Sequence, residues 1–399
     1  MNAPVKQHLI DPEICIRCYT CEMTCPVGAI EHDDNNVVVD AEKCNFCMDC
    51  IAPCPTGSID EWRVVSTPYS LEDQYSWMDL PEQESFDETK GDSAETSLEA
   101  LDDSVAQLLT EAHQGAGGKS KAPASAAKPS INLFNLGKPA LARVQGNFRL
   151  TAETASSDIR HIILDMGEQR LPVLEGQSVG ILPPGTDAAR KPHLPSLYSI
   201  SSPRDGEKQN SNNFALTVKR EPEGLCSNYL CDLEIGSEVQ LTGPFGATFL
   251  MPEDPAEKLL MICTGTGAAP FRGFTMRRQR TQPERTGQMA LFFGARSPEE
   301  LPYFGPLGKV SEDFMAKFYA FSRVADQPKA WVQDRMREES AFLTGWLADP
   351  QLNVYICGLK EMEDGVHEAF AEIAGEAGMN WPELRDRLRD EGRYHVETY

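Results

Sequence analysis

Eight of the chain's twelve cysteines fall into two short runs with identical spacing. The first run, CIRCYTCEMTCP, begins at Cys15, and the second, CNFCMDCIAPCP, begins at Cys44. Each cysteine of the second run lies 29 residues after its counterpart, and the flanking residues match as well, Asp11 with Asp40. Thiolates are soft ligands that select zinc and iron–sulfur clusters. The chain therefore carries an internally duplicated metal-binding pattern, which is stronger evidence than either run alone.

The spacing C-x2-C-x2-C-x3-C-P is that of bacterial two-cluster ferredoxins. Three cysteines of a run converge on one 4Fe-4S cluster, and the fourth cysteine ligates the other cluster. The sequence therefore predicts two ligand sets: Cys15, Cys18, Cys21 and Cys54 for the first cluster, and Cys44, Cys47, Cys50 and Cys25 for the second. A zinc site or a disulfide knot is the alternative, but zinc sites usually have two CxxC pairs set well apart. A unit of about 60 residues with few large apolar side chains needs the metal to fold.

Length and charge limit the remaining possibilities. A chain of 399 residues exceeds what one hydrophobic core usually supports, so more than one domain is expected. The formal net charge of −24 argues against nucleic acid as a partner, because phosphates would repel the protein. We find no run of about 18 apolar residues and no secretory leader, so we expect no membrane span and a cytoplasmic protein with reduced thiols.

Composition divides the chain into four parts. Residues 1–65 are predicted to form an α+β two-cluster ferredoxin domain, and residues 66–130 a linker. Within the linker, SLEALDDSVAQLLTEAH could form one short amphipathic helix or a partly helical acidic tether, and GAGGKSKAPASAAKPS is typical of flexible linkers. Residues 131–250 contain short β runs separated by Gly/Pro turns, which predict an antiparallel β-barrel. In residues 251–399, apolar strands alternate with helical patterns, which predict an α/β domain with a parallel sheet.

A glycine turn follows the first strand of the α/β domain, in the stretch KLLMICTGTGAAPF. Gly265 and Gly267 leave no side chain between the backbone and a pyrophosphate, and Thr266 lies between them. The helix that is expected to start near Pro270 would present its N-terminus to the phosphate charge. A single GxG is weak evidence, but here it lies between a strand and a helix.

Residues 131–399 resemble the ferredoxin–NADP reductase family, and the motifs are spread along this whole stretch. SLYSISSP resembles the family's flavin motif, GLCSNYLCDL its second flavin segment, and VYICGLKEMEDGV the segment with the active-site cysteine; the chain ends in VETY, as family members do. The resemblance implies that Tyr198 stacks on the ring of FAD and that Ser199 faces its N5 atom. It also implies that Cys226 and Ser227 approach the FAD pyrophosphate.

The same resemblance implies roles around the nicotinamide. Tyr399 would cover the flavin ring where nicotinamide must enter, and Cys357 and Glu397 would position and polarise the nicotinamide. A nucleophilic thiol is the rival role for Cys357. The family motif begins with an arginine that holds the flavin pyrophosphate, but this chain has Ser196 there.

Lys219 or Arg220 is expected to supply the positive charge that Ser196 lacks at the flavin pyrophosphate.

The choice between NADPH and NADH also depends on cations. FSRVADQPKAWVQDRM resembles the family's cradle for the 2′-phosphate of NADPH, with Trp331 in place of a tyrosine. The cradle positions are Ser322, Arg323, Lys329 and Gln333. Two cations with hydroxyl and amide donors favour NADPH over NADH, although both cations could be ordinary surface charges.

Together the modules predict electron transfer from NADPH through FAD to two 4Fe-4S clusters and on to an external acceptor. The sequence has no di-iron, haem or facial-triad motif, so oxygen activation must lie in another protein. The domain order resembles the reductase components of systems in which a separate di-iron oxygenase epoxidises benzoyl-CoA during aerobic benzoate degradation. Two alternatives stay open: a general NADPH–ferredoxin reductase with a built-in ferredoxin, and a non-enzymatic electron-carrier module.

Overall fold

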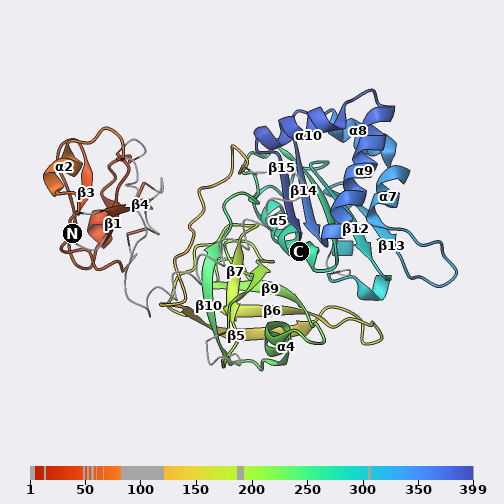
Figure 1. Ribbon diagram of the computed structural model, residues 1–399, viewed down its shortest axis with the longest axis horizontal. Coiled ribbons are helices and arrows are strands. Elements are labelled where there is room, and N and C mark those ends of the chain that lie inside the picture. The colour runs from red at the N-terminus through yellow and green to blue at the C-terminus, as the bar shows by residue number, and fades with distance from the viewer. Residues whose placement is uncertain are drawn as a thin grey trace, which may run out of the picture. The chain divides into compact units, whose positions relative to one another are not determined.

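The chain forms two compact units, Met1–Asp92 and Ser93–Tyr399, which are described separately (Figure 1). The computed structural model describes residues 5–12, 15–47, 50–51, 54, 58–59, 61–65, 67–81, 121–186, 193–303 and 307–398. The possible amphipathic helix of residues 97–113 and the predicted flavin-covering Tyr399 lie outside these residues. Among the helices that are described, none is long and apolar enough to cross a membrane.

The N-terminal unit is a small α+β fold built around the two cysteine runs. Its two antiparallel pairs and first helix are β1 (Val5–Leu9) with β4 (Glu61–Val65), β2 (Ile30–His32) with β3 (Val37–Val39), and α1 (Thr20–Thr24). Arg17 and Phe46 each precede the second cysteine of their run, and both adopt the left-handed backbone conformation, with φ of 52° and 57°. The internal duplication is therefore visible in the backbone as well as in the sequence.

A short segment after β4 packs on this unit, within the range that was predicted as linker. It contains α2 (Leu71–Tyr75), whose N-terminus is capped by Ser70. The Asn36 side chain donates to the backbone carbonyls of Gln74, Tyr75 and Trp77 at 3.1, 3.2 and 2.8 Å. These amide contacts extend the folded unit to Trp77, and Arg63 Nε donates to the carbonyl of Pro81 at 2.9 Å, which extends it to residue 81.

The first part of the C-terminal unit is an antiparallel barrel with the strand order β8-β7-β10-β5-β6-β9. Its elements are β5 (Ala140–Arg149), β6 (Ile159–Asp165), β7 (Ser178–Leu182), β8 (Ser196–Ser199), β9 (Asn213–Lys219), α4 (Leu225–Asp232) and β10 (Glu238–Phe245). Ile200, directly after β8, forms an antiparallel bridge with Leu216 of β9. This bridge joins the two edge strands and closes the sheet, so the predicted barrel is confirmed.

The second part is a five-stranded parallel sheet with the order β13-β12-β11-β14-β15. Its strands are β11 (Lys258–Thr264), β12 (Met289–Ala295), β13 (Met315–Phe321), β14 (Leu352–Gly358) and β15 (Tyr394–Thr398). Its helices are η2 (Gly265–Gly267), α5 (Ala268–Thr281), η3 (Pro298–Glu300), α7 (Val332–Glu338), α8 (Ser340–Leu347), α9 (Lys360–Glu376) and α10 (Trp381–Asp390).

Helices cover both faces of this sheet, with α5 on one face and α7 to α10 on the other (Figure 1). Successive residues of β11 alternate between the two cores: Leu259, Met261 and Cys263 face α5, whereas Leu260 and Ile262 face the opposite layer. The α/β prediction is confirmed. Because all five strands are parallel, their carboxyl ends form one edge, which is where such sheets bind ligands.

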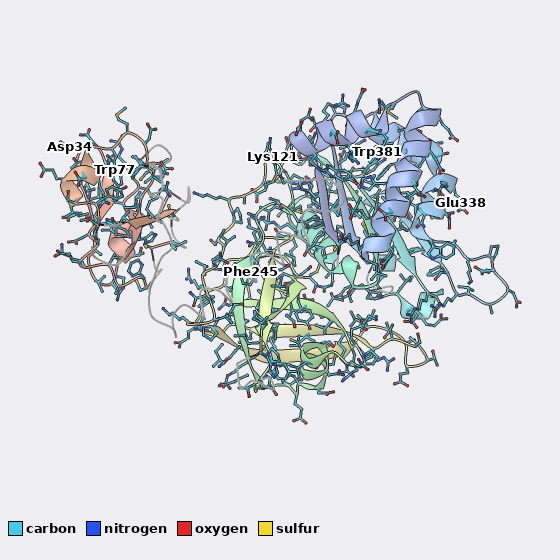
Figure 2. The ribbon with its side chains drawn as sticks, viewed as in Figure 1. Asp34, Trp77, Lys121, Phe245, Glu338 and Trp381 are labelled. Atoms are coloured by element: carbon cyan, nitrogen blue, oxygen red, sulfur yellow. The ribbon has the colours of Figure 1, made fainter. Side chains whose placement is uncertain are left out.

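The last residues of the predicted linker run along the surface of the C-terminal unit. Lys121 Nζ donates to the backbone carbonyl of Asp390 at 3.1 Å (Figure 2). Ser125 Oγ donates to the carboxylate of Glu257 at 2.5 Å. Residues 121–125 are thus attached to the α/β domain, and Gln177 beside the barrel strand β7 donates to the carbonyl of Ser130 at 2.9 Å.

Candidate functional site

Four cysteines from both runs surround one small cavity in the N-terminal unit. Cys44, Cys47 and Cys50 of the second run line this cavity together with Cys25 of the first run. The thiol of Cys25 also interacts electrostatically with that of Cys44. The structure thus brings together the four residues that the sequence assigns to the second cluster.

The other four cysteines also lie near one another. Cys54 of the second run interacts electrostatically with both Cys18 and Cys21, and Cys15 interacts with Cys21. Burial raises the pKa of Cys21 to about 11. Without a metal this thiol stays protonated at neutral pH, so iron would have to displace its proton.

The two groups fit the predicted clusters by the chemistry of their donors. Each group supplies four sulfur ligands, and thiolate sulfur is the ligand that holds iron–sulfur cubes. Each group also crosses from one run to the other, as a two-cluster ferredoxin requires.

A large cavity of about 690 Å³ lies where the barrel meets the carboxyl edge of the parallel sheet. The barrel contributes Lys219, the last residue of β9, and the sheet contributes the glycine turn after β11. Predicted nucleotide residues that line the cavity are Gly265, Thr266, Ser322, Arg323 and Gln333, and Lys219, predicted for the flavin pyrophosphate, lines it too. Trp331 lines it as well, whereas Lys329 is exposed and is not among the described lining residues.

The two glycines of the turn have different surroundings. Gly265 has a φ of +55°, and a side chain there would meet no atom within 4 Å. Its left-handed backbone is what favours glycine there, beside an open cavity. A Cβ on Gly267 would lie 2.1 Å from the backbone oxygen of Cys357. Gly267 is therefore needed for close packing of the turn against β14.

The predicted flavin residues lie on β8 and at the start of α4. Tyr198 is on β8, and Cys226 and Ser227 are in the first turn of α4. The side chains of Tyr198 and Ser196 lie close to the Cys226 thiol, whose pKa is raised by burial. These two flavin segments are thus adjacent.

The two cations that might replace the family's arginine have different partners. Lys219 Nζ pairs with the carboxylate of Glu221 at 2.6 Å at the rim of the nucleotide cavity. The guanidinium of Arg220 pairs with Asp158 at 3.1 Å and with Asp232 at 2.8 Å. Lys219 is therefore the one of the two that lines the nucleotide cavity.

Ser199 and Glu397 are in contact. Ser199 Oγ donates to Glu397 Oε1 at 3.2 Å, and Ser178 Oγ donates to the same oxygen at 3.3 Å. Cys357 lies opposite Glu397 in the register of β14 and β15 and is 0% exposed. Burial, reinforced by the charge of Glu397, raises the pKa of the Cys357 thiol well above its usual value.

Sequence reasoning missed a contact across the nucleotide cavity. Glu300 of η3 accepts hydrogen bonds from the Ser156 amide at 2.7 Å, from Ser156 Oγ at 2.6 Å and from Ser157 Oγ. Burial opposes ionisation, but these bonds hold the pKa of Glu300 below its usual value. Arg296 donates to Ser156 Oγ at 3.0 Å, and both Arg296 and Glu300 line the cavity. Their position just after β12, at the carboxyl edge, was the available signal.

A second buried contact lies next to the first. Tyr303, which follows η3, inserts its hydroxyl between His161 Nδ1 of β6 at 2.9 Å and Thr217 Oγ1 of β9 at 2.5 Å. Arg272 of α5 stacks over the Tyr303 ring and forms an ion pair with Glu207. Residues 296–303 therefore attach the α/β domain firmly to the barrel.

Comparison with protein families agrees with this architecture. Residues 7–55 match the description "4Fe-4S dicluster domain", residues 149–249 "Oxidoreductase FAD-binding domain", and residues 261–368 "Oxidoreductase NAD-binding domain". The fold and the cavity therefore define a flavin- and nicotinamide-dependent oxidoreductase with an iron–sulfur domain.

Proteins of similar sequence identify the family within this class of oxidoreductases. A ferredoxin–NADP reductase from Spirulina sp. is 38% identical over 288 residues, which cover 67% of this chain and 98% of the relative. One from a Picosynechococcus strain is 35% identical over 326 residues, covering 74% of this chain and 81% of the relative. The chain belongs to the ferredoxin–NADP reductase family and is an NADPH-dependent reductase of that type with an N-terminal 4Fe-4S domain.

A solved structure shares the fold of the C-terminal unit. The ferredoxin–NADP+ reductase from Plasmodium falciparum superimposes with a TM-score of 0.54 at 22% identity. The match covers 67% of this chain and 99% of that one. At this identity it supports the fold alone.

Proposed function

We propose that the protein moves electrons from NADPH through FAD to two 4Fe-4S clusters and on to a separate di-iron oxygenase that epoxidises benzoyl-CoA. The observation that carries the relay is the crossing of the cysteine runs, in which Cys25 joins Cys44, Cys47 and Cys50 around one cavity. An iron–sulfur domain that precedes a complete reductase in one chain gives the electrons an internal acceptor.

In this proposal the barrel holds FAD, which supplies the ability to take a hydride and release its two electrons singly. Tyr198 stacks on the flavin ring, with Tyr399 on the nicotinamide side, and Cys226 and Ser227 approach the pyrophosphate. Lys219 stands in for the missing arginine charge. Lys219 pairs with a single carboxylate, that of Glu221, whereas Arg220 pairs with both Asp158 and Asp232, so Lys219 is favoured.

Three residues act at the point of hydride transfer. Ser199 faces N5 of the flavin and fixes the carboxylate of Glu397 through the 3.2 Å hydrogen bond. Glu397 and Cys357 then hold the nicotinamide close and aligned, which is the main way a protein speeds hydride transfer. Because its thiol is fully buried and protonated, Cys357 acts by packing and polarisation and does not act as a nucleophile.

We attribute the preference for NADPH over NADH to the residues of the predicted 2′-phosphate cradle, which line one part of the cavity. Arg323, Ser322 and Gln333 would bind the 2′-phosphate through charge-assisted and neutral hydrogen bonds, and Trp331 would flank the adenine. Lys329 is exposed on the same loop, from which its flexible side chain can reach the phosphate. Gly265 and Thr266 lie at the turn where the pyrophosphate would pass.

The domain order, with a duplicated eight-cysteine domain ahead of the reductase, supports the di-iron oxygenase as acceptor. A second candidate is a general NADPH–ferredoxin reductase with a built-in ferredoxin. The observation that favours it is that the curated relatives are called ferredoxin–NADP reductases and that the chain spans 98% of one of them. The carrier-only alternative loses support, because the chain belongs to a reductase family.

One experiment separates these functions. The protein is purified without oxygen, its iron, sulfide and flavin are counted, and NADPH oxidation is measured with a purified di-iron oxygenase or with free ferredoxin. We expect about eight irons and one flavin per chain, and faster turnover with the oxygenase. Equal rates with free ferredoxin would favour the general reductase. Absence of flavin and of NADPH-dependent dye reduction would favour the carrier.

A further inference from the structure

The two cysteine runs have equivalent backbone hydrogen bonds. The Cys15 amide donates to the Asp11 carbonyl at 3.1 Å, and the Cys44 amide donates to the Asp40 carbonyl at 2.9 Å. Corresponding cysteines also have the same burial: the first and fourth of each run are half-buried, the second is exposed and the third is buried. Solvent exposure of the ligands therefore does not distinguish one predicted cluster from the other.

The residue four positions after the last cysteine of each run is also equivalent. The Asp11 amide donates to the carbonyl of Ser58, and the Asp40 amide donates to the carbonyl of Ala29, both at 2.7 Å. Ser58 and Ala29 thus occupy matching places in the backbone, and only their side chains differ. The serine has a hydroxyl, and the alanine has none.

Two hydroxyl groups contact sulfur atoms of the first predicted cluster. Thr20 Oγ1 donates to Cys18 Sγ at 3.4 Å, and Ser58 Oγ lies 3.4 Å from Cys54 Sγ. A thiolate that is bound to iron has no proton, so the hydroxyl of Ser58 must be the donor. Cys18 and Cys54 belong to the same predicted ligand set, although they come from different runs.

Within the part of the chain that the structure describes, no hydroxyl contacts a sulfur of the second predicted set. The sequence counterpart of Thr20 is Asp49, which lies outside the described residues; an ionised carboxylate only accepts hydrogen bonds. Ala29, in place of Ser58, offers only its backbone amide, which donates to Cys25 Sγ at 3.2 Å. The two repeats therefore have the same cysteine ligands but differ at two neighbouring positions, Thr20 against Asp49 and Ser58 against Ala29.

The charges carried by the two cysteine runs are balanced. Residues 11–25 and residues 40–54 each contain three carboxylates and one cation. His8 also lines the cavity of the second set, but its Nε2 lies against the backbone carbonyl of Ile59. Among the described contacts to ligand sulfurs, the first set has the two hydroxyl donors and the second set has the Ala29 amide.

We propose that Thr20 and Ser58 give the cluster of Cys15, Cys18, Cys21 and Cys54 the higher midpoint potential of the two. This inference rests on the two-cluster assignment proposed above. Reduction adds one electron to a cluster and forms no bond, so the added negative charge spreads over the iron and its sulfur ligands. A donor that points at a ligand sulfur stabilises this charge and raises the potential. A single electron in the N-terminal unit therefore resides mainly on the first cluster.

An EPR-monitored redox titration of the full-length, cluster-loaded protein tests this proposal. We expect two one-electron waves in the unaltered protein. Thr20→Val and Ser58→Ala should each move the upper wave to a more negative potential and leave the lower wave unchanged. Ala29→Ser, which inserts the hydroxyl at the matching place of the second set, should move the lower wave to a more positive potential.

Thr24→Val is the matched control on α1, because the Thr24 hydroxyl donates to the backbone oxygens of Thr20 and Cys21 and not to sulfur. It should move neither wave. Two waves that stay in place in Thr20→Val, Ser58→Ala and Ala29→Ser would overturn the inference while the two-cluster assignment stands. A single wave with about four irons in the unaltered protein would overturn both.

Discussion

Ser199 at the end of β8 and Glu397 at the end of β15 are 198 residues apart in the sequence and share a hydrogen bond of 3.2 Å. The first residue belongs to the barrel and the second to the parallel sheet. The residue proposed to face the flavin and the residue proposed to hold the nicotinamide are therefore linked directly. The distance in space between these two side chains therefore depends on how the barrel packs against the parallel sheet.

Ser199→Ala should slow hydride transfer from NADPH to FAD by about 10²-fold, because a small misplacement of reacting groups costs about that much. Stopped-flow bleaching of the flavin measures the rate. Ser178→Ala is the control, since Ser178 donates to the same oxygen of Glu397 at 3.3 Å. Equal losses in both variants would mean that Ser199 acts only by holding Glu397.

The thiol of Cys357 should resist alkylation in the folded protein. Burial raises its pKa well above the usual value, so the reactive thiolate is absent at pH 7 to 8 and the site is closed to reagents. Mass spectrometry after iodoacetamide treatment of the native, loaded protein measures labelling at this residue. The same protein unfolded in urea serves as the control and should be labelled fully. Rapid labelling in the native state would support the nucleophile role instead.

Arg323→Ala should raise the KM for NADPH roughly 10- to 100-fold and leave the KM for NADH nearly unchanged. The variant loses a charge-assisted contact to the 2′-phosphate, worth about 1.5–3 kcal/mol, and NADH has no such phosphate. Arg337→Ala is a suitable control, because that guanidinium pairs with Glu372 on the surface. A parallel loss with both nucleotides would show that Arg323 does not read the phosphate.

Glu300→Ala should destabilise the C-terminal unit by about 1–3 kcal/mol, because it leaves the buried hydroxyl of Ser157 without its acceptor and removes the bonds from the exposed Ser156. Urea unfolding followed by flavin fluorescence measures the change. Glu299→Ala, one residue earlier on the surface, should change stability little. A stable Glu300→Ala protein would mean that the contact across the cavity contributes little to the junction.

Cysteine substitutions can test the crossed ligation. Cys25→Ser should remove about four irons per chain, and adding Cys44→Ser should remove no more, because both residues would ligate one cluster. Combining Cys25→Ser with Cys15→Ser should instead remove both clusters. Iron and sulfide analysis measures the loss. If the Cys25→Ser, Cys15→Ser double variant kept one cluster, each run would be holding its own.

Periodic and repeated patterns made much of this fold predictable. The cysteine spacing predicted the N-terminal unit, short β runs between Gly/Pro turns predicted the barrel, and strands alternating with helical patterns predicted the parallel sheet. The grouping of Cys25 with Cys44 also agrees with the spacing rule, because that rule describes where the chain turns. Sequence sufficed where a repeated spacing or a regular alternation of elements determines which residues meet.

Contacts between distant segments were not predictable in this way. The bond between Glu300 and Ser156 joins residues 144 apart, and no periodicity marks either one. Gly267 was interpreted as a phosphate turn, but its small size also serves packing against Cys357. Both depend on how two elements approach each other in space, which a single sequence does not encode locally.

The attachment of residues 121–130 has a practical consequence for building chimaeras. A designer who exchanges the N-terminal module for another electron carrier would naturally splice at residue 131, where the globular composition starts. That junction would remove the Lys121 and Ser125 contacts to Asp390 and Glu257 and expose the surface they cover. A splice placed upstream of Lys121 keeps these two contacts, and the reductase surface beneath them stays covered. The N-terminal iron–sulfur domain can then be exchanged without altering the reductase.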